Sequence, residues 1–304
     1  MKDIREEILR LKERNNAIIL AHNYQALEIQ EIADFVGDSL ELSLRSREAD
    51  AEIIVFAGVR FMAEQAQVLN PDKRILIPVP SAICSLASMV TVDMIRKYRK
   101  YYPEAPIVVY VNSPIEVKAE ADYVVTSASA ASVVSKLDAD TIIFAPDSNL
   151  ANYVSRITKK RIIPVPPTGH CYVHLLITPY DILEAKKQHP EAVVMVHPEV
   201  PPESQKIADY IGGTSGMVKF VARSDSKVFL VGTETGMLNR LRREFPDKKF
   251  YPIVPQADCI GMKKITLESI YRSLRDMVYE ISVEEKYARR VRAALERTFD
   301  LLGV

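Results

Sequence analysis

The pattern of apolar and polar positions defines two kinds of segment. These two kinds follow one another along the chain in a fixed order. Residues 3–14 place Ile4, Ile8 and Leu11 at helical spacing in an otherwise charged stretch, which predicts an amphipathic helix. Residues 17–21 form a short, fully apolar run, which is typical of a buried strand in a parallel sheet. Helices that alternate with such strands predict an α/β fold.

The same order recurs twice more. Thr91 and Thr178 are expected helix N-caps, with Pro179 at a first helical position, and apolar runs at 107–111 and 193–196 are the predicted strands that follow. Further buried strands are predicted at 53–59, 141–146 and 227–233, each leading into a helix that begins near Phe61, Leu150 or Met237. The last predicted strand of each round runs through a basic, proline-containing segment and ends at a cysteine, as in 73–84, 160–171 and 248–259.

The cysteines mark a repeat of domain size. Cys84, Cys171 and Cys259 lie 87 and 88 residues apart. Each has a proline four residues before it and a threonine seven residues after it, and each round contains an Ala-Asp-aromatic signature that is expected on a helix (33–35, 121–123 and 208–210). A unit copied three times is therefore predicted. The expected domains are 1–84, 85–171 and 172–259, and C-terminal helices within 260–304 are expected to pack against the first repeat.

Composition excludes several classes of protein. Forty basic and forty acidic residues balance, and 48% of the chain is apolar, which is ordinary for a soluble globular protein. No basic run provides the electrostatic surface of a nucleic-acid-binding protein. The chain shows neither a signal-peptide pattern at its start nor an apolar run of membrane-spanning length, so a cytoplasmic protein is expected.

Three single cysteines favour bound or reduced thiols over a disulfide framework. No close Cys-x2-Cys pair is present, which argues against a structural zinc site. A [4Fe–4S] cluster held by three thiolates would leave one iron open as a Lewis acid. Two alternatives remain at this level: three buried, inert thiols, or a fourth ligand supplied by His170 or His174.

Polar side chains follow the predicted strands. His22, Asn23 and Tyr24 follow one strand, Tyr110 and Asn112 another, and His197 and Glu199 a third. Ligands of parallel sheets bind beyond the carboxyl ends of the strands, so these residues offer acid, base and hydrogen-bonding groups for a site there. Singly, each histidine has a structural alternative as a satisfied strand-end residue, the tyrosines as core aromatics, and the Ser/Thr loops at 126–128 and 213–216 as helix caps. His189 is expected on the surface.

Short motifs along nearly the whole chain resemble the quinolinate synthase family, iron–sulfur enzymes of NAD biosynthesis. They lie at residues 19–25, 32–42, 61–64, 70–73, 84–87, 110–113, 126–130, 169–174, 196–199, 214–217, 232–237 and 259–267. The resemblance implies three pseudo-threefold-related α/β/α domains around a [4Fe–4S] cluster. It also implies condensation of iminoaspartate with dihydroxyacetone phosphate to quinolinate, with release of phosphate and water and with one iron open to substrate. Functional coupling to an iminoaspartate-producing enzyme follows from that substrate.

Site residues carry over by matching motif. The resemblance implies that Cys84, Cys171 and Cys259 are the cluster ligands. It implies an active-site lining made of His22, Tyr24, Ser39, Tyr110, Asn112, Ser127, His197, Glu199 and Thr214. Within this lining His22, Tyr24, Tyr110 and Glu199 are the expected catalytic residues, with Tyr24 and Glu199 moving protons. Asn112, Ser127, His197 and Thr214 are expected to hold carboxylate or phosphate groups.

The chain departs from the family pattern at a few positions. Val117, Val125 and Val200 stand where many relatives carry further cysteines, which argues against thiol-based regulation, and Gly213 stands where a serine is common. Two rivals to the family's activity are a three-cysteine redox enzyme, resembling diphthamide synthase subunits or hydroxymethylbutenyl diphosphate reductase, and a cluster-based sensor. The motifs of those redox enzymes are not found in the sequence.

Overall fold

The computed structural model describes residues 3–303, so residues 1, 2 and 304, at the outer ends of the predicted first repeat and C-terminal segment, lie outside the described part. The chain forms two compact units. The first contains the residues up to Cys84 together with Cys259–Arg289, and the second contains Ser85–Asp258 together with the residues from Arg290 onward. The chain thus leaves the first unit at one predicted cluster cysteine and returns to it at another.

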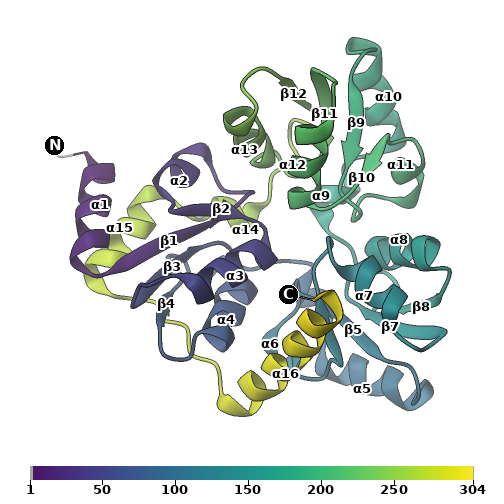
Figure 1. Ribbon diagram of the computed structural model, residues 1–304, viewed down its shortest axis with the longest axis horizontal. Coiled ribbons are helices and arrows are strands. Elements are labelled where there is room, and N and C mark those ends of the chain that lie inside the picture. The colour runs from purple at the N-terminus through teal and green to yellow at the C-terminus, as the bar shows by residue number, and fades with distance from the viewer. Residues whose placement is uncertain (1–2, 304) are drawn as a thin grey trace. The chain divides into compact units, whose positions relative to one another are not determined.

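The first unit is built on a parallel sheet with the strand order β2-β1-β3-β4 (Figure 1). Its elements before Cys84 are α1 (Ile4–Arg14), β1 (Ala17–His22), α2 (Leu27–Ile32), β2 (Phe35–Gly37), α3 (Ser39–Glu48), β3 (Ile53–Ala57), α4 (Arg60–Leu69) and β4 (Arg74–Leu76). After Cys259 come α14 (Ile260–Lys263) and α15 (Leu267–Asp276). Helices α1 and α15 pack together, and Ile270 and Leu274 of α15 enter the same core as Ile19 and Val55 of the sheet.

The second unit contains two further sheets of the same topology, with orders β6-β5-β7-β8 and β10-β9-β11-β12. The elements of the second repeat are η1 (Ala87–Met89), α5 (Val92–Tyr101), β5 (Ile107–Tyr110), α6 (Ile115–Lys118), β6 (Tyr123–Val125), α7 (Ala130–Lys136), β7 (Thr141–Ala145), α8 (Ser148–Thr158) and β8 (Arg161–Pro164). Those of the third are α9 (Tyr172–Leu175), α10 (Pro179–Gln188), β9 (Val193–Val196), α11 (Pro202–Lys206), β10 (Tyr210–Ile211), α12 (Thr214–Arg223), β11 (Val228–Gly232), α13 (Met237–Glu244) and β12 (Lys249–Pro252).

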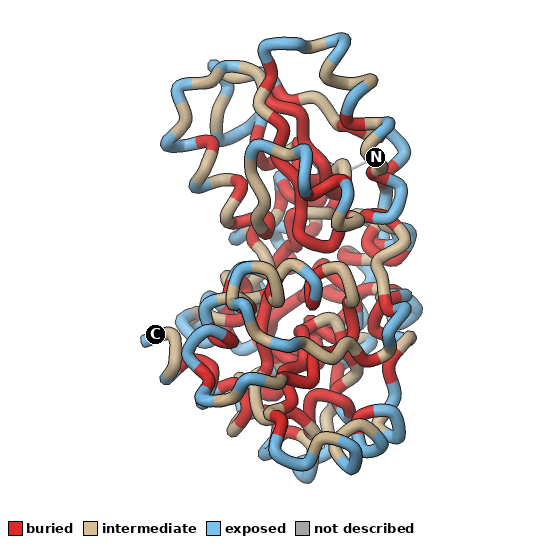
Figure 2. The backbone as a smooth tube through the Cα atoms, turned by 90° about the vertical axis from the view of Figure 1, so that its right-hand side faces the viewer, coloured by how far each residue is buried: buried red, intermediate tan, exposed pale blue. Residues whose placement is uncertain are grey.

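Helices cover both faces of each sheet, so the predicted α/β class with three short parallel sheets is confirmed over residues 3–303 (Figure 1). Strands such as β3 and β5 are buried along their whole length. Figure 2 shows the corresponding separation, with buried stretches inside and exposed residues at the periphery. Among the described residues, no helix combines the length and the apolar character needed to cross a membrane.

The Ala-Asp-aromatic signature has a structural explanation that differs from the expected one. Its residues lie where a helix gives way to an edge strand, not on the helix, and the aromatic residue begins β2, β6 or β10. The aspartate Oδ2 accepts the N–H of Ile19, Ile107 or Val194 at 2.8 Å in all three repeats. This bond fixes the start of the edge strand beside the central strand. The edge strands are only two or three residues long, which is too short for a period-2 pattern to reveal.

Two further expectations need correction. The predicted strands before the cysteines stop at Leu76, Pro164 and Pro252, because the prolines that follow cannot donate to a ladder. Helix α16 (Glu285–Leu302) does not follow α15 onto the first repeat. Its Thr298 Oγ1 accepts the N–H of Val124 on the edge strand β6 at 3.2 Å, and its Arg297 donates to the carbonyl of Asp122. The helix thereby covers a sheet edge of the second repeat.

The aspartate–strand bond predicts a measurable loss of stability. Asp209→Ala leaves the N–H of the buried Val194 without its acceptor, and we expect a cost of about 1–2 kcal/mol. Asp209→Asn keeps an acceptor oxygen and should cost less. Asp225→Ala, at an exposed acid of the same repeat, is the matched control in thermal unfolding. Equal melting temperatures for the Asp209→Ala and Asp225→Ala proteins would contradict this account of the signature.

Candidate active site

Three sets of equivalent residues follow the central strands. His22, Tyr110 and His197 lie at the carboxyl ends of β1, β5 and β9, and Tyr24, Asn112 and Glu199 come two residues later in each repeat. A third set provides hydroxyls: Ser39 and Thr214 begin α3 and α12, and Ser127 lies in the turn before α7. All nine predicted lining residues therefore lie at the carboxyl edges of their own sheets. His22, Tyr24 and Ser39 belong to the first unit, and the other six to the second.

The histidines of the first and third repeats share one local geometry. The N–H of Tyr24 donates to His22 Nδ1 at 3.2 Å, and the N–H of Glu199 donates to His197 Nδ1 at 3.3 Å. Burial lowers the pKa of His197 to about 3, so its imidazole is neutral and Nε2 carries the proton. That Nε2 lies 3.1 Å from Ser127 Oγ. His197 therefore donates to Ser127, and the hydroxyl retains its own proton for a ligand.

In the first unit, the turn that carries Tyr24 is fastened to the helix after Cys259. Lys263 Nζ donates to the carbonyl of Tyr24 at 2.7 Å, and Gln25 Nε2 lies 3.5 Å from Met262 Sδ. The same helix approaches the other cysteine of the unit, since a Cβ on Gly261 would lie 2.3 Å from the carbonyl oxygen of Ile83. Only glycine permits this approach, which brings the segments of Cys84 and Cys259 together.

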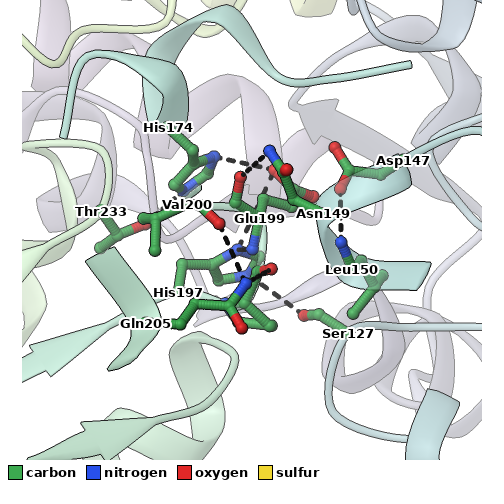
Figure 3. Close-up of polar contacts among 11 residues, drawn as sticks. Ser127, Asp147, Asn149, Leu150, His174, His197, Glu199, Val200, Gln205 and Thr233 are labelled. Carbon is green, nitrogen blue, oxygen red and sulfur yellow. Dashed lines mark hydrogen bonds and ion pairs between the residues drawn. The ribbon is translucent and has the colours of Figure 1, made fainter. Parts of the chain in front are cut away.

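Glu199 is the centre of the site in the second unit (Figure 3). Its carboxylate is 2% exposed, and Oε2 lies 2.8 Å from His174 Nδ1 and 3.9 Å from His197 Nδ1. The Tyr110 hydroxyl donates to the same carboxylate, while Asn149 Nδ2 donates to the Glu199 carbonyl at 3.0 Å. The site joins the second and third repeats within one unit.

The pKa values of two buried carboxyl groups in this site shift in opposite directions. Burial alone would raise the pKa of Glu199, but the adjacent imidazoles of His174 and His197 and the hydrogen bonds from His174 and Tyr110 lower it. Asp147 is fully buried, and burial together with the charge on Glu199 raises its pKa well above the usual range. Pairs of acids whose pKa values are driven apart are suited to separate acid and base roles.

The cysteines are held in equivalent ways. The N–H groups of Arg60, Ser148 and Thr235, just after the strands β3, β7 and β11, donate to the carbonyl two residues before each cysteine, at 2.8, 2.8 and 3.1 Å. Cys171 and Cys259 then cap one-turn helices with nearly the same backbone angles, φ −86° in both and ψ 119° and 106°. All three thiols lie within the described residues, are half-buried and form no disulfide. Their thiol chemistry fits an iron–sulfur cluster.

Sequence reasoning missed part of this network. It considered His170 and His174 only as a fourth iron ligand, whereas His174 lies against Glu199 and stacks on His197 with ring centroids 4.5 Å apart. His170 instead bonds the Thr168 carbonyl through Nδ1 at 2.8 Å. Asp147, Asn149 and Thr233 were not singled out. The Cys171-x2-His174 spacing was the available signal, since residues three apart on a helical turn share a face.

Fold and site together define an α/β enzyme built from repeats, with acid–base groups and thiols at the carboxyl ends of parallel strands. Residues 6–300 match the family model described as quinolinate synthetase A protein. The chain is 56% identical over 299 residues to a quinolinate synthase of Pyrococcus horikoshii, covering 98% of this chain and 99% of that protein. It is 49% identical over 300 residues to one of Methanocaldococcus jannaschii, covering 97% and 98%. The chain belongs to the quinolinate synthetase A protein family and is an enzyme of that family.

Gly213 gives a prediction about the wall of the site. A Cβ at this position would lie 2.6 Å from Ser127 Oγ, so Gly213→Ala should displace the hydroxyl from His197 and lower the melting temperature. Removing the hydroxyl first should relieve the collision, and the Ser127→Ala/Gly213→Ala double variant should therefore lose less than the sum of the single changes. Additive losses in thermal unfolding would show that the two residues do not compete for this space.

Proposed function

We propose that the enzyme condenses iminoaspartate with dihydroxyacetone phosphate to form quinolinate in NAD biosynthesis. The observation that carries the proposal is a nearly full-length match to proteins named quinolinate synthase, in a chain whose strand ends bear the buried Glu199 and its partners. All nine residues inferred from the family motifs lie at strand carboxyl ends. The iminoaspartate would come from an oxidising enzyme that acts on an amino acid, since imines hydrolyse in water and must be used promptly.

We propose further that Cys84, Cys171 and Cys259 hold one [4Fe–4S] cluster with one iron open to substrate. Their equivalent positions, their half-burial and the absence of a disulfide among them support this ligand set. The bound cluster would supply a Lewis acid that polarises substrate oxygen. The remaining chemistry belongs to the protein's own side chains.

The overall reaction balances without an electron acceptor. Iminoaspartate and dihydroxyacetone phosphate together contain the atoms of quinolinate, inorganic phosphate and two water molecules. No net oxidation or reduction remains, so the task of the protein is to move protons and to hold leaving groups. This requirement matches a site that is rich in acid and base groups.

Proton transfer is assigned to Tyr24 and Glu199. His22 and Tyr110 are the other two proposed catalytic residues. The lowered pKa of Glu199 keeps it charged and able to accept a proton during dehydration. His174 Nδ1, 2.8 Å from Glu199 Oε2, holds the carboxylate in place. Tyr24 lies at the equivalent place in the first repeat and is assigned the second transfer.

Anion binding is assigned to the hydroxyl and amide groups. Ser39 and Thr214 are the first residues of α3 and α12. Asp38 caps the start of α3, whereas Gly213 provides no side-chain cap for α12, so the helix dipole and backbone N–H groups favour phosphate or carboxylate at Thr214. Ser127 retains a hydroxyl proton because His197 donates to it. Asn112, half-buried after β5, supplies an amide donor.

A cluster-dependent redox enzyme and a cluster-based sensor remain the rivals. The first would need electrons for turnover, and the second would show no turnover. Assay of anaerobically reconstituted protein with iminoaspartate and dihydroxyacetone phosphate separates them. We expect quinolinate without added reductant, and a strict requirement for reductant would reject the proposal.

The ligand set predicts the iron content of variants. Cys84→Ser, Cys171→Ser and Cys259→Ser should each fall from about four irons per chain to less than half that value after anaerobic reconstitution. Ser85→Ala, an exposed neighbour of Cys84, is the control and should bind iron normally. Full iron content in any one cysteine variant would remove that thiol from the ligand set.

Adjacent lysines provide a matched test of how Tyr24 is positioned. Lys263 Nζ donates to the Tyr24 carbonyl, whereas Lys264 Nζ donates to the Ser81 carbonyl at 2.8 Å. Lys263→Met should lower kcat about tenfold, since a charged hydrogen bond contributes about 1.5–3 kcal/mol. Iron content should stay normal, and Lys263→Arg should recover part of the rate. Lys264→Met is the control, and equal rates for the two methionine variants would exclude a role for Lys263.

A further inference from the structure

The side chains of Cys171, His174 and Glu199 bring three different metal-binding groups together in the second unit. A thiol, an imidazole and a carboxylate each present one ligand atom within 4.8 Å of the others. In a tetrahedral zinc site, bonds of about 2.0–2.3 Å place ligand atoms about 3.3–3.8 Å apart. Small rotations would therefore close these groups around one ion. We propose that the protein without its cluster binds one Zn²⁺ ion at Cys171, His174 and Glu199.

Glu199 provides a second observation that points to a cation ligand. Its Oε1 is buried and has no hydrogen-bond partner, although the residue is only 2% exposed. Buried carboxylate oxygens normally have partners, so each exception needs an explanation. A cation that binds this oxygen, next to the Oε2 that faces His174, supplies one.

The surroundings of His174 suit a metal ligand. Its Nε2 lies 2.9 Å from Thr233 Oγ1, in a buried contact, and Nδ1 faces Glu199. With zinc on Nδ1, the imidazole would carry its proton on Nε2 and donate it to Thr233, whose hydroxyl can accept. Such outer contacts orient metal-bound histidines.

The donor set selects the kind of ion. Thiolate and imidazole favour Zn²⁺ over Mg²⁺ and Ca²⁺, which prefer oxygen ligands. Charge also balances, because the Cys171 thiolate and the Glu199 carboxylate offset the two charges of the ion. A Cys-x2-His pair plus one carboxylate leaves the fourth position to water, so this is no structural zinc site of the closed type.

Only the second cysteine has this setting. Three residues after Cys84 stands Ala87, and three after Cys259 stands Met262, where Cys171 has His174. The positions equivalent to Glu199 are Tyr24 and Asn112. The other two cysteines are therefore built-in controls for zinc binding at Cys171.

Competition with the cluster is the functional consequence, and this part rests on the proposed function. An ion on Cys171 removes one of the three proposed cluster ligands and occupies the carboxylate proposed as a base. Zinc would thus hold the enzyme in an inactive form and prevent cluster assembly. The zinc site itself depends only on the residues of the second unit.

The decisive test uses the unmodified sequence. Protein stripped of metal under anaerobic conditions is treated with one equivalent of Zn²⁺, and alkylation of each cysteine is followed by peptide mass spectrometry. We expect Cys171 to be alkylated at least about tenfold more slowly, with Cys84 and Cys259 unchanged. Protection of all three thiols alike, or of none, would overturn the site.

Variants and iron uptake extend the test. Glu199→Gln and Thr233→Val should each weaken zinc binding about tenfold or more in competition with a chromophoric chelator, whereas Cys84→Ser should bind as the unaltered protein does. Unchanged affinity in Glu199→Gln would also overturn the site. Preloaded zinc should then lower iron uptake in the unaltered protein and not in Glu199→Gln. A protein that takes up no iron at all rejects the proposed function, while the alkylation result still decides the zinc site.

Discussion

One backbone hydrogen bond, made three times, connects the fold to the chemistry. In each repeat, a backbone N–H just after β3, β7 or β11 donates to the carbonyl two residues before the cysteine. The donors are Arg60, Ser148 and Thr235. The bond therefore ties the cysteine loop to the end of this strand, even though a proline-rich segment separates the last strand from the cysteine. At Gly169 the contact is so close that a Cβ would lie 1.8 Å from the Pro146 carbonyl oxygen. The scaffold thus fixes the position of each cysteine through its main chain.

Burial gives the site of the second unit its acid–base character. Glu199 and His197 are both nearly inaccessible to water, so their protonation depends on one another and on His174. A carboxylate among imidazoles and a tyrosine hydroxyl stays charged, while Asp147 in the same interior favours its neutral form. The same low-dielectric surroundings that make an unpaired charge costly also strengthen the interactions between a charge and its partners.

Many helices and strands could be predicted from the sequence, because each sequence pattern occurs three times, once in each repeat. The predicted threonine caps Thr91 and Thr178 accept hydrogen bonds from the first turns of their helices, and the central strands lie within a residue or two of their expected ends. Edge strands of two or three residues carry too little pattern to detect. The side of the molecule that α16 covers depends on Thr298 and Arg297, whose tertiary partners no local pattern reveals. The contact of His174 with Glu199 likewise depends on how the chain runs from Cys171 to Glu199, which no local sequence pattern predicts.

The repeats share a scaffold but differ in chemistry, and the differences concentrate around Cys171. The residue just before the N–H donor of the repeated backbone bond is Val59 in the first repeat, Asp147 in the second and Glu234 in the third. Three residues after each cysteine the repeats carry Ala87, His174 and Met262. At these positions the second and third repeats therefore carry two buried acids and one histidine. The first repeat has the aliphatic residues Val59 and Ala87 there. A threefold scaffold can hold three equal ligands, but directional proton transfer needs unequal neighbours. The asymmetry around Cys171 and Glu199 provides that inequality without disturbing the repeated backbone bonds.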